Sequence, residues 1–239
     1  MSLVTPRKGY KSVPWLFGKE IEIPEEWEIS EIQNHAKITT GDKDTQNKVE
    51  GGKYPFFVRS KKIEKINSYS FEGEAILTAG DGEIGKIVHY INDKFDFHQR
   101  VYKISNFDNF LNGRFFYYYF SKHFLNRALS MSAKNTVDSV RMEMIAKMFI
   151  PIPPLPEQQQ IASILSNVDN LIESNEQVIT HSKSLKKGLM QKLLTRGIGH
   201  TRFKKIKWFF GKEIEIPQEW EKIKLSHITV LITKGSSPN

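Results

Sequence analysis

The sequence predicts an α+β fold in which a mixed α/β domain is followed by one long α-helix. Short strand-like segments, separated by glycine and Asp/Asn turns, occupy much of the first 150 residues. A proline-rich stretch then leads into an apolar pattern with the period of a helix. A third observation, an internal repeat, predicts that the 239 residues hold one complete unit and the start of a second.

The first part of the chain mixes both kinds of element. Phe107 to Leu129 is predicted to be a helix, and a second short helix is predicted over Ser139–Lys147. Six consecutive aromatic residues, 115–120, would point in all directions around the first helix, so most are expected in the core. The mixture predicts an α+β domain over residues 1–152. Four runs predict strands: Phe56–Val58, Ala75–Thr78, Lys86–Tyr90 and Arg100–Ile104.

Residues 153–197 are predicted to form the long helix. Ile150 to Pro156 should be extended, because its prolines suit neither a helix interior nor a central strand. Pro156 is well placed to open the helix, Gly197 ends the pattern, and Gly188 is a weak point within it. A helix of this length with an exposed apolar stripe is not stable alone and needs a partner helix.

The stripe of this helix is broader than a strict heptad seam, so we expect it to pack against more than one neighbour. Asn175 and Ser182 occupy seam positions, where they either fix the register or leave the seam locally hydrated. The residues predicted to mediate dimerisation are Ile161, Ile164, Leu165, Val168, Leu171, Ile172, Asn175, Val178, Ile179, Leu185 and Leu189.

An internal repeat predicts where a second unit begins. Trp15–Trp27 returns as Trp208–Trp220, and 11 of the 13 positions are identical without a gap. We therefore expect residues 198–239 to be the truncated start of a second repeat. Such a short segment cannot bury a core by itself. It must pack on the first unit or on another copy of the chain, or else not pack at all.

Composition excludes several classes of protein. The chain has no cysteine and no His-x-x-x-His pair, so we expect neither disulfides nor a metal site. It has no run of 18 uncharged apolar residues and no signal-peptide pattern at its start, which predicts a cytoplasmic protein without membrane contact.

The net charge is +8, and its excess is local. Nine Lys and Arg residues and no acid lie between Lys183 and Lys207. Such a cluster suits a polyanionic partner, although a solvated helix face explains it equally well.

The proline segment and the two ends of the long helix resemble the specificity subunit of type I restriction-modification enzymes. Pro151–Leu165, with the sequence PIPPLPEQQQIASIL, is similar to the segment that opens the conserved helix of that family, and Leu185–Thr195 is similar to its end. Ile23–Trp27 and Ile216–Trp220 resemble the starts of its two target-recognition domains. The resemblance covers the whole chain.

The resemblance implies a plan of two recognition domains, each followed by a long helix, with the two helices packed antiparallel. Each domain would read one half of a bipartite site in double-stranded DNA. It also implies a non-catalytic subunit without a cofactor of its own. Such a subunit docks modification (methyltransferase) subunits, which use S-adenosylmethionine, and through them ATP-dependent restriction subunits.

This chain departs from that plan, because it has one complete recognition domain and one long helix. We therefore expect two copies to pair through their helices about a two-fold axis and to read an inverted-repeat site. Two alternatives stay open: a stand-alone dimeric DNA-binding regulator, and a structural protein whose coiled coil links domains for a partner other than nucleic acid.

Motifs for catalysis are present only in part. Gly80–Lys86 has the spacing of a phosphate-binding loop, but Ile87 replaces the Ser/Thr that would hold magnesium and a strand-like run follows. We expect a tight hairpin connection there, similar to a glycine–lysine loop of the family's recognition domains. The acids of this loop have the wrong spacing for a nuclease. Ile152–Leu155 is not the Asn/Asp-Pro-Pro-aromatic tetrapeptide that a methyltransferase needs.

Two polar regions are predicted to contact DNA: Thr39 to Lys65, and His98–Arg100, where His98 and Arg100 would share one face of a strand. Lys134–Thr136 is a weaker third candidate. For any one residue an ordinary solvated side chain is an equally good explanation, but as a group we favour contact with DNA. The predicted DNA-binding residues are Lys43, Gln46, Asn47, Lys48, Lys53, Arg59, Ser60, Lys61, Lys62, Lys86, His98, Gln99, Arg100 and Lys134.

Overall fold

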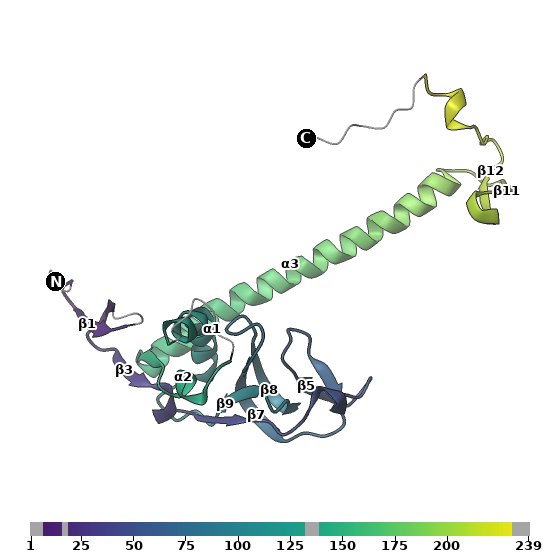
Figure 1. Ribbon diagram of the computed structural model, residues 1–239. Coiled ribbons are helices and arrows are strands. Elements are labelled where there is room, and N and C mark those ends of the chain that lie inside the picture. Colours follow the sequence, from purple (N-terminus) through teal and green to yellow (C-terminus); the bar gives the residue numbers. More distant parts are fainter. Residues whose placement is uncertain (1–6, 16–18, 132–138, 231–239) are drawn as a thin grey trace. The chain divides into compact units, whose positions relative to one another are not determined.

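The computed structural model describes residues 7–15, 19–131 and 139–230. The chain forms two compact units, Met1–Asp169 and Asn170–Asn239. Figure 1 traces the secondary-structure elements along the chain. Among the described residues, no helix combines the length and the apolar character needed to cross a membrane.

A six-stranded sheet in the order β4-β9-β7-β8-β5-β6 forms the centre of the first unit. Its neighbouring strands are antiparallel except for β5 and β8, which run parallel. The loop after β7 leads directly into its antiparallel neighbour β8, so the hairpin predicted at Gly80–Lys86 is confirmed. With residues 80–87 in the loop, however, the connection is longer than the predicted tight turn. The strands are β4 (Lys37–Thr40), β5 (Tyr54–Phe57), β6 (Glu64–Ile66), β7 (Phe71–Ala79), β8 (Val88–Phe97) and β9 (Val101–Ser105).

Helices α1 (Gly113–Ser130) and α2 (Met142–Ala146) belong to the same unit. The prediction that the first helix begins at Phe107 is wrong. Asn106 has a φ of 56°, in the left-handed region that a right-handed helix does not use, and the chain turns before α1. Asn112 then caps the helix, since its side chain accepts a hydrogen bond from the Phe115 N–H at 2.9 Å. The second helix is also shorter than predicted, because Ser139 forms a bridge to Asp81.

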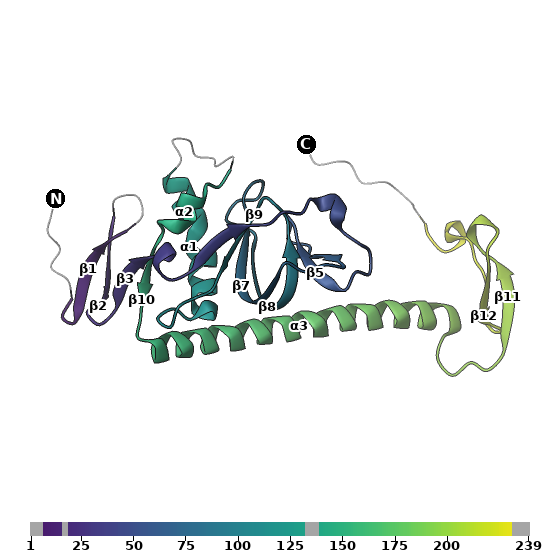
Figure 2. The ribbon, with the colours of Figure 1, turned by 90° about the horizontal axis from the view of Figure 1, so that it is seen from below.

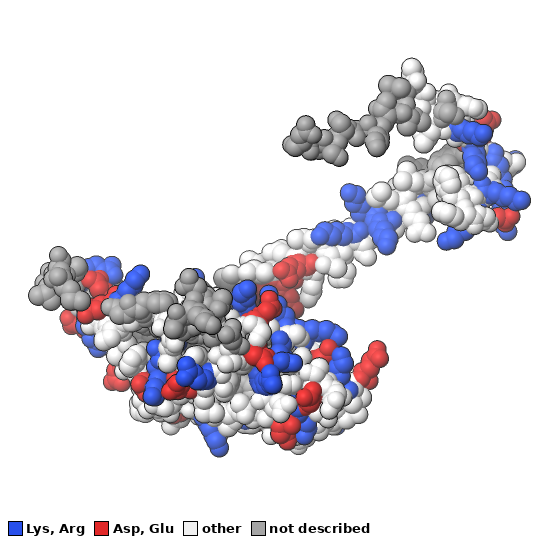
Figure 3. All heavy atoms as spheres, viewed as in Figure 1, with Lys and Arg blue, Asp and Glu red and all other residues white. Residues whose placement is uncertain are grey.

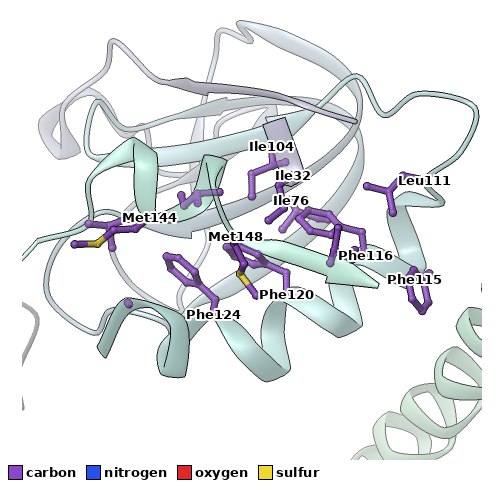
Figure 4. Close-up of a cluster of buried hydrophobic side chains, with 14 of the residues drawn as sticks. Ile32, Ile76, Ile104, Leu111, Phe115, Phe116, Phe120, Phe124, Met144 and Met148 are labelled. Carbon is purple, nitrogen blue, oxygen red and sulfur yellow. The ribbon is translucent and has the colours of Figure 1, made fainter. Parts of the chain in front are cut away.

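The core of the first unit forms where α1 packs on the sheet. Phe116, Phe120 and Phe124, spaced four residues apart, are completely buried on one face of α1. Figure 4 shows these rings with Ile76 and Ile104 of the sheet. Within the aromatic run 115–120 the three phenylalanines are buried and the three tyrosines are half-buried, which confirms that the run is mainly core.

Two smaller sheets lie at the start of the first unit. Strand β1 (Tyr10–Pro14) pairs antiparallel with β2 (Glu20–Pro24), and β3 (Glu28–Glu31) pairs antiparallel with β10 (Phe149–Ile152). Figure 2 shows β3 beside β10. Strand β10 contains Pro151, which a two-stranded sheet tolerates because both strands are at an edge. The proline segment is therefore extended up to Ile152, as predicted. Its last residues, Leu155 and Pro156, already belong to the long helix, because proline is tolerated in the first turn of a helix.

Helix α3 (Leu155–Arg196) has 42 residues, which corresponds to a length of about 63 Å. Its first turn is anchored by Gln158, which is fully buried. The Gln158 side chain accepts from the Asn112 N–H and donates to the carbonyl oxygens of Phe110 and Pro153, each at 2.8 Å. Gly188 does not interrupt the helix. Gly197, with a φ of 64°, ends it and donates its N–H to the Leu193 carbonyl at 2.9 Å.

In the second unit, α3 is followed by β11 (Phe203–Lys207) and β12 (Glu213–Pro217), which form an antiparallel hairpin. Short 3₁₀ turns, η4 (Phe209–Gly211) and η5 (Leu225–His227), complete its described elements. The predicted α+β fold with one long helix is thus confirmed.

Candidate nucleic-acid interface

Three loops of the first unit meet at the carboxylate of Asp81. Arg59, which follows β5, places its Nη1 atom 3.1 Å from both Oδ1 and Oδ2 of Asp81. Arg100, which precedes β9, places its Nη1 atom 2.8 Å from Oδ2. The Asp81 side chain is 18% exposed, whereas the two arginines are 42% and 63% exposed. One largely buried acid therefore holds two guanidinium groups that face solvent.

The charge of Asp81 is stable at neutral pH. Burial raises the pKa of Asp81, but the hydrogen bonds and charges of Arg100 and Arg59 lower it by more, so the net shift is downward. The loop is also held in place by its backbone. Gly80 donates to the Arg100 carbonyl at 2.8 Å and accepts from the Val140 N–H at 2.7 Å. A Cβ atom at Gly80 would lie 2.8 Å from the Arg100 carbonyl oxygen, so this close approach favours glycine.

The His98–Arg100 segment is a turn, and the prediction that it is a strand is wrong. His98 is 2% exposed and its N–H donates to the Phe57 carbonyl, which ties it to the end of β5. Its Nδ1 atom accepts from the Arg100 N–H at 2.9 Å. Burial, and next the charge of Arg59, lower the pKa of His98 and favour this neutral acceptor. His98 and Arg100 consequently do not share a face, because His98 points inward to support the turn.

The predicted polar loop around Lys43 lies against this turn. The Gln99 N–H donates to the Lys43 carbonyl at 2.8 Å, and the Gln99 side chain donates to Asp44 at 3.2 Å. Asn47 closes the loop by accepting from the Asp44 N–H at 2.7 Å. Lys43 is half-buried. Gln46, three residues later in η3 (Thr45–Asn47), is exposed. The structure thus brings together part of both predicted polar regions.

Among the described residues, none of the other predicted cations forms an ion pair with Asp81. Lys48 and Lys62 both contact Glu64, at 3.4 Å and 3.2 Å. Lys53 lies over the ring of Tyr54, with Nζ 5.1 Å from the ring centroid. Lys61 and Lys86 are exposed, and the hydroxyl of Ser60 donates to the Lys62 carbonyl. Lys134 lies outside the described residues.

This surface is not uniformly basic. In Figure 3, Lys and Arg are interspersed with Asp and Glu on the first unit, whereas they gather without acids along the C-terminal part of α3. A hollow of about 230 Å³ lies beside the Asp81 group. It is lined by Thr40, Gly80, Asp81, Gln99, Arg100, Tyr102, Ser139 and Val140. Such an arrangement presents hydrogen-bond donors in fixed directions and so suits recognition of groups with defined geometry.

Sequence reasoning did not find Asp81 or Asp44 as members of the site. Asp81 is flanked by Gly80 and Gly82, which indicates a turn, and an acid in a turn between strands is commonplace. Its contacts with two arginines depend on the pairing of β9 with β7 and of β5 with β8. No local feature of the sequence signals them.

The architecture is that of solved specificity subunits. The crystal structure of the S subunit of a type I restriction-modification system from M. genitalium matches with a TM-score of 0.59 and 21% identity, over 70% of this chain and 45% of that one. A structure described as the basis of complex assembly and conformational transition of the type I R-M system matches with a TM-score of 0.52 and 18% identity, over 72% and 45% of the two chains. At these identities the likeness establishes the fold.

The family follows from sequence. Residues 24–181 match the model of the type I restriction modification DNA specificity domain, and the chain belongs to this family. Its relatives include the type I restriction enzyme MjaVIII specificity subunit of Methanocaldococcus jannaschii, 31% identical over 87% of this chain and 50% of that protein. Another is the EcoDI specificity subunit of Escherichia coli, 24% identical over 91% and 52%.

This confirms the resemblance inferred from the proline segment and the ends of the long helix. The chain spans about half the length of the curated relatives it matches. Their names are those of specificity subunits, in agreement with the prediction of a non-catalytic component.

Proposed function

We propose that the first unit reads one half of a bipartite site in double-stranded DNA, and that the Asp81 group is the centre of the reading surface. The observation that carries this proposal is that Arg59 and Arg100, from separate parts of the chain, are held by one largely buried carboxylate with their forks exposed. Side chains ordered in advance lose less conformational entropy when they bind.

The side chains around Asp81 suit base edges. An arginine fork donates two hydrogen bonds to the O6 and N7 atoms of guanine, and the amide of Gln99 matches the N6 and N7 atoms of adenine. His98 acts indirectly, by holding the turn that carries Gln99 and Arg100. The remaining predicted residues would position the phosphate backbone. They are Lys43, Gln46, Asn47, Lys48, Lys53, Ser60, Lys61, Lys62, Lys86 and Lys134.

Helix α3 would supply the second half of the site by pairing antiparallel with α3 of a second copy. Its stripe residues beyond Ile161 are all exposed; Leu171 and Leu185, for example, are each 63% exposed. Burying such a stripe against its own copy gives a large apolar gain, and a two-fold axis makes the same surface serve both chains. Two identical recognition units would then read an inverted repeat across a fixed gap.

The paired chains would act as the specificity component of a larger complex. They would dock methyltransferase subunits, which bring S-adenosylmethionine, and ATP-dependent restriction subunits. The test is a genome-wide methylation map from cells that express this chain with a modification subunit. We expect an inverted-repeat motif with an unspecified central gap. An asymmetric bipartite motif would overturn the pairing of identical copies, and the absence of new methylation from a confirmed complex would overturn the proposed role.

An Arg59→Ala/Arg100→Ala chain is the matched variant for this map. It keeps α3 and its stripe unchanged, so it should still assemble while the motif is lost or relaxed. Retention of the same motif by this variant would remove the Asp81 group from the reading surface.

A further inference from the structure

The two sequence repeats fold in the same way. The register of β11 with β12 reproduces that of β1 with β2, so Phe203↔Pro217 corresponds to Tyr10↔Pro24. The Trp208 N–H donates to the Lys212 carbonyl at 2.7 Å, as the Trp15 N–H donates to that of Lys19 at 2.6 Å. The 3₁₀ turns η2 (Ile32–Asn34) and η5 (Leu225–His227) follow at equivalent positions. Where the structure describes both, the hairpin and the 3₁₀ turn of residues 203–228 therefore repeat those of residues 10–35.

The first segment, residues 10–35, is covered by its recognition unit. Trp15 packs edge-on against Tyr119 and His123 of α1, with ring centroids 6.1 Å and 5.4 Å away. Strand β3 pairs with β10, and Ile32 at the start of η2 is completely buried. The Ile32 N–H donates to the Met148 carbonyl at 3.1 Å. The surface of α1 and β10 is thus a receptor for this segment.

In the second segment, residues 203–228, the side chains equivalent to Trp15 and Ile32 are exposed. Trp208, equivalent to Trp15, is 44% exposed, and Leu225, equivalent to Ile32, is 66% exposed. Phe209 and Phe210 next to Trp208 are exposed as well. In the part of the chain that the structure describes, residues 221–224, equivalent to β3, pair with no strand. The second segment therefore presents a docking face that matches a receptor of known composition.

We propose that residues 203–228 dock on the α1 and β10 surface of a second copy of the chain, where they take the place of its own residues 10–35. Exchange of equivalent elements between identical chains costs little, because the interactions broken within one chain are re-formed between the two chains. In the docked segment Trp208 would replace Trp15 and Leu225 would replace Ile32. The pairing with β10 uses backbone groups, and residues 221–224 contain no proline that would prevent it.

This docking rests on the proposed antiparallel pairing of α3, which would deliver the segment to its receptor. If the two helices pair antiparallel with the midpoints of their stripes aligned, Leu193 of one helix lies beside Ile161 of the other. The receptor lies at that end of α3, since the Tyr118 hydroxyl contacts Ser166 at 3.2 Å and Asp169 at 2.6 Å. The repeated segment 203–228 begins shortly after α3 ends at Arg196. A short connection would therefore lead from the paired helix of one chain to the receptor surface of the other.

The experiment uses the absence of native cysteines. One chain carries Lys122→Cys, at an exposed position next to His123, and a differently tagged chain carries Lys207→Cys, at an exposed position next to Trp208. The two are mixed and treated with a short bismaleimide, and the mixed adduct is measured by mass spectrometry. We expect a mixed adduct, whose yield falls roughly tenfold when Trp208→Ala is added to the second chain, as for loss of a central interface tryptophan.

Two further variants sharpen the result. Trp15→Ala in the Lys122→Cys chain should raise the yield, because it weakens the competing segment. Ile198→Ala, at an exposed position before the second segment, should leave the yield unchanged. No mixed adduct, or one insensitive to Trp208→Ala, would overturn the docking. If light scattering then still gave a dimer the helix pairing would stand, whereas a monomer mass would overturn both.

Discussion

The segments 10–35 and 203–228 share 13 of 26 residues and form equivalent β-hairpins and 3₁₀ turns, yet their side chains lie in different surroundings. Ile32 is completely buried where Leu225 is 66% exposed, and Trp15 is half-buried where Trp208 is 44% exposed. The hairpin and the 3₁₀ turn depend on residues close in sequence, so both copies form them. Burial depends on α1 and β10, which only the first unit contains. Within one chain, the same local structure therefore forms both with and without tertiary packing around it.

The contrast extends to the units that contain the segments. In the first unit α1 buries its phenylalanines, whereas the stripe of α3 beyond Asp169 is exposed. In the first unit arginines contact acids such as Asp81. In the second unit, among the ion pairs of the described residues, none involves the lysines of α3. The first unit therefore buries its own apolar side chains, whereas the second exposes the apolar stripe of α3.

The largest effect should come from placing a charge in the exposed stripe. We expect Leu171→Asp to lower the association constant of the chain at least about 100-fold, because pairing would bury an unpaired carboxylate from each copy. Gln177→Asp, at an exposed position on the opposite face of α3, should leave the mass unchanged. Light scattering across micromolar concentrations measures both. Equal masses for the two variants would show that the stripe does not pair.

The difference in burial between the two segments is tested most directly by shortening equivalent side chains. In the Leu171→Asp background, which we expect to keep the chain monomeric, Ile32→Ala should lower the free energy of unfolding by about 2–5 kcal/mol, as for other buried residues of this size. Leu225→Ala should change it by less than about 0.5 kcal/mol. Urea unfolding followed by circular dichroism measures the difference. Similar losses of unfolding free energy for both variants would mean that residues 203–228 are buried even in a single chain.

A buried charge in the first unit predicts a dependence on pH. Lys103 is 8% exposed, with Nζ 3.5 Å from the centroid of the Phe71 ring, and burial with the charge of Lys37 lowers the pKa of Lys103 to about 8. Between that pH and the usual 10.5 the unfolded chain binds a proton that the folded chain has lost. The free energy of unfolding therefore rises with pH through this window, while below it the cost of burying the charge is fully present.

Lys103→Met should thus be more stable than the parent at pH 7, and the difference should narrow by about 2 kcal/mol as the pH approaches 10. Lys187→Met, at an exposed position of α3 outside the stripe, is the matched control and should leave the pH profile unchanged. Urea unfolding at a series of pH values measures all three chains. A constant difference between parent and Lys103→Met would contradict the depressed pKa.

Removing the carboxylate that joins the two arginines should affect discrimination more than affinity. Asp81→Ala frees Arg59 and Arg100 and removes a negative charge, so binding to random DNA should strengthen slightly. Preference for the correct half-site should fall by about 1–3 kcal/mol. Fluorescence anisotropy of the assembled complex with matched and mismatched duplexes measures both quantities. A uniform change on all duplexes would remove Asp81 from a role in sequence reading.

The smallest effect is expected for Lys86, an exposed cation for which the described residues provide no acidic partner. Lys86→Ala should weaken binding to every duplex alike, by less than about 1 kcal/mol, and should reduce the slope of log K against log salt by about 1. The same anisotropy titrations, repeated at several salt concentrations, provide this slope. A change in sequence preference would instead show that Lys86 contacts bases, the role proposed for Arg100.

Some elements follow from local sequence alone. The proline segment and the apolar stripe predict the long helix within two residues of its observed ends, because proline, glycine and helical periodicity act over a few residues. The start of α1 is predicted six residues too early, because the many aromatic residues from Phe107 onward suggest a helix. The left-handed backbone of Asn106 and the cap at Asn112 determine where the helix starts.

The site divides in the same way. Residue type alone selects Arg59, Gln99 and Arg100 as candidates for DNA contact, but it also places His98 among them, and His98 is buried. Which candidates point outward depends on the turn between β8 and β9, and this turn is held by Phe57 from another strand.

The fold class, the long helix, the duplicated segment and the family could all be inferred from the sequence, because each rests on the types and spacing of residues along the chain. The tertiary structure alone decided that Asp81 joins Arg59 and Arg100, and that one copy of the duplicated segment is covered while the other is exposed. Both depend on strands and helices far apart in the chain coming into contact, and the cost and gain of those contacts are shared among many residues.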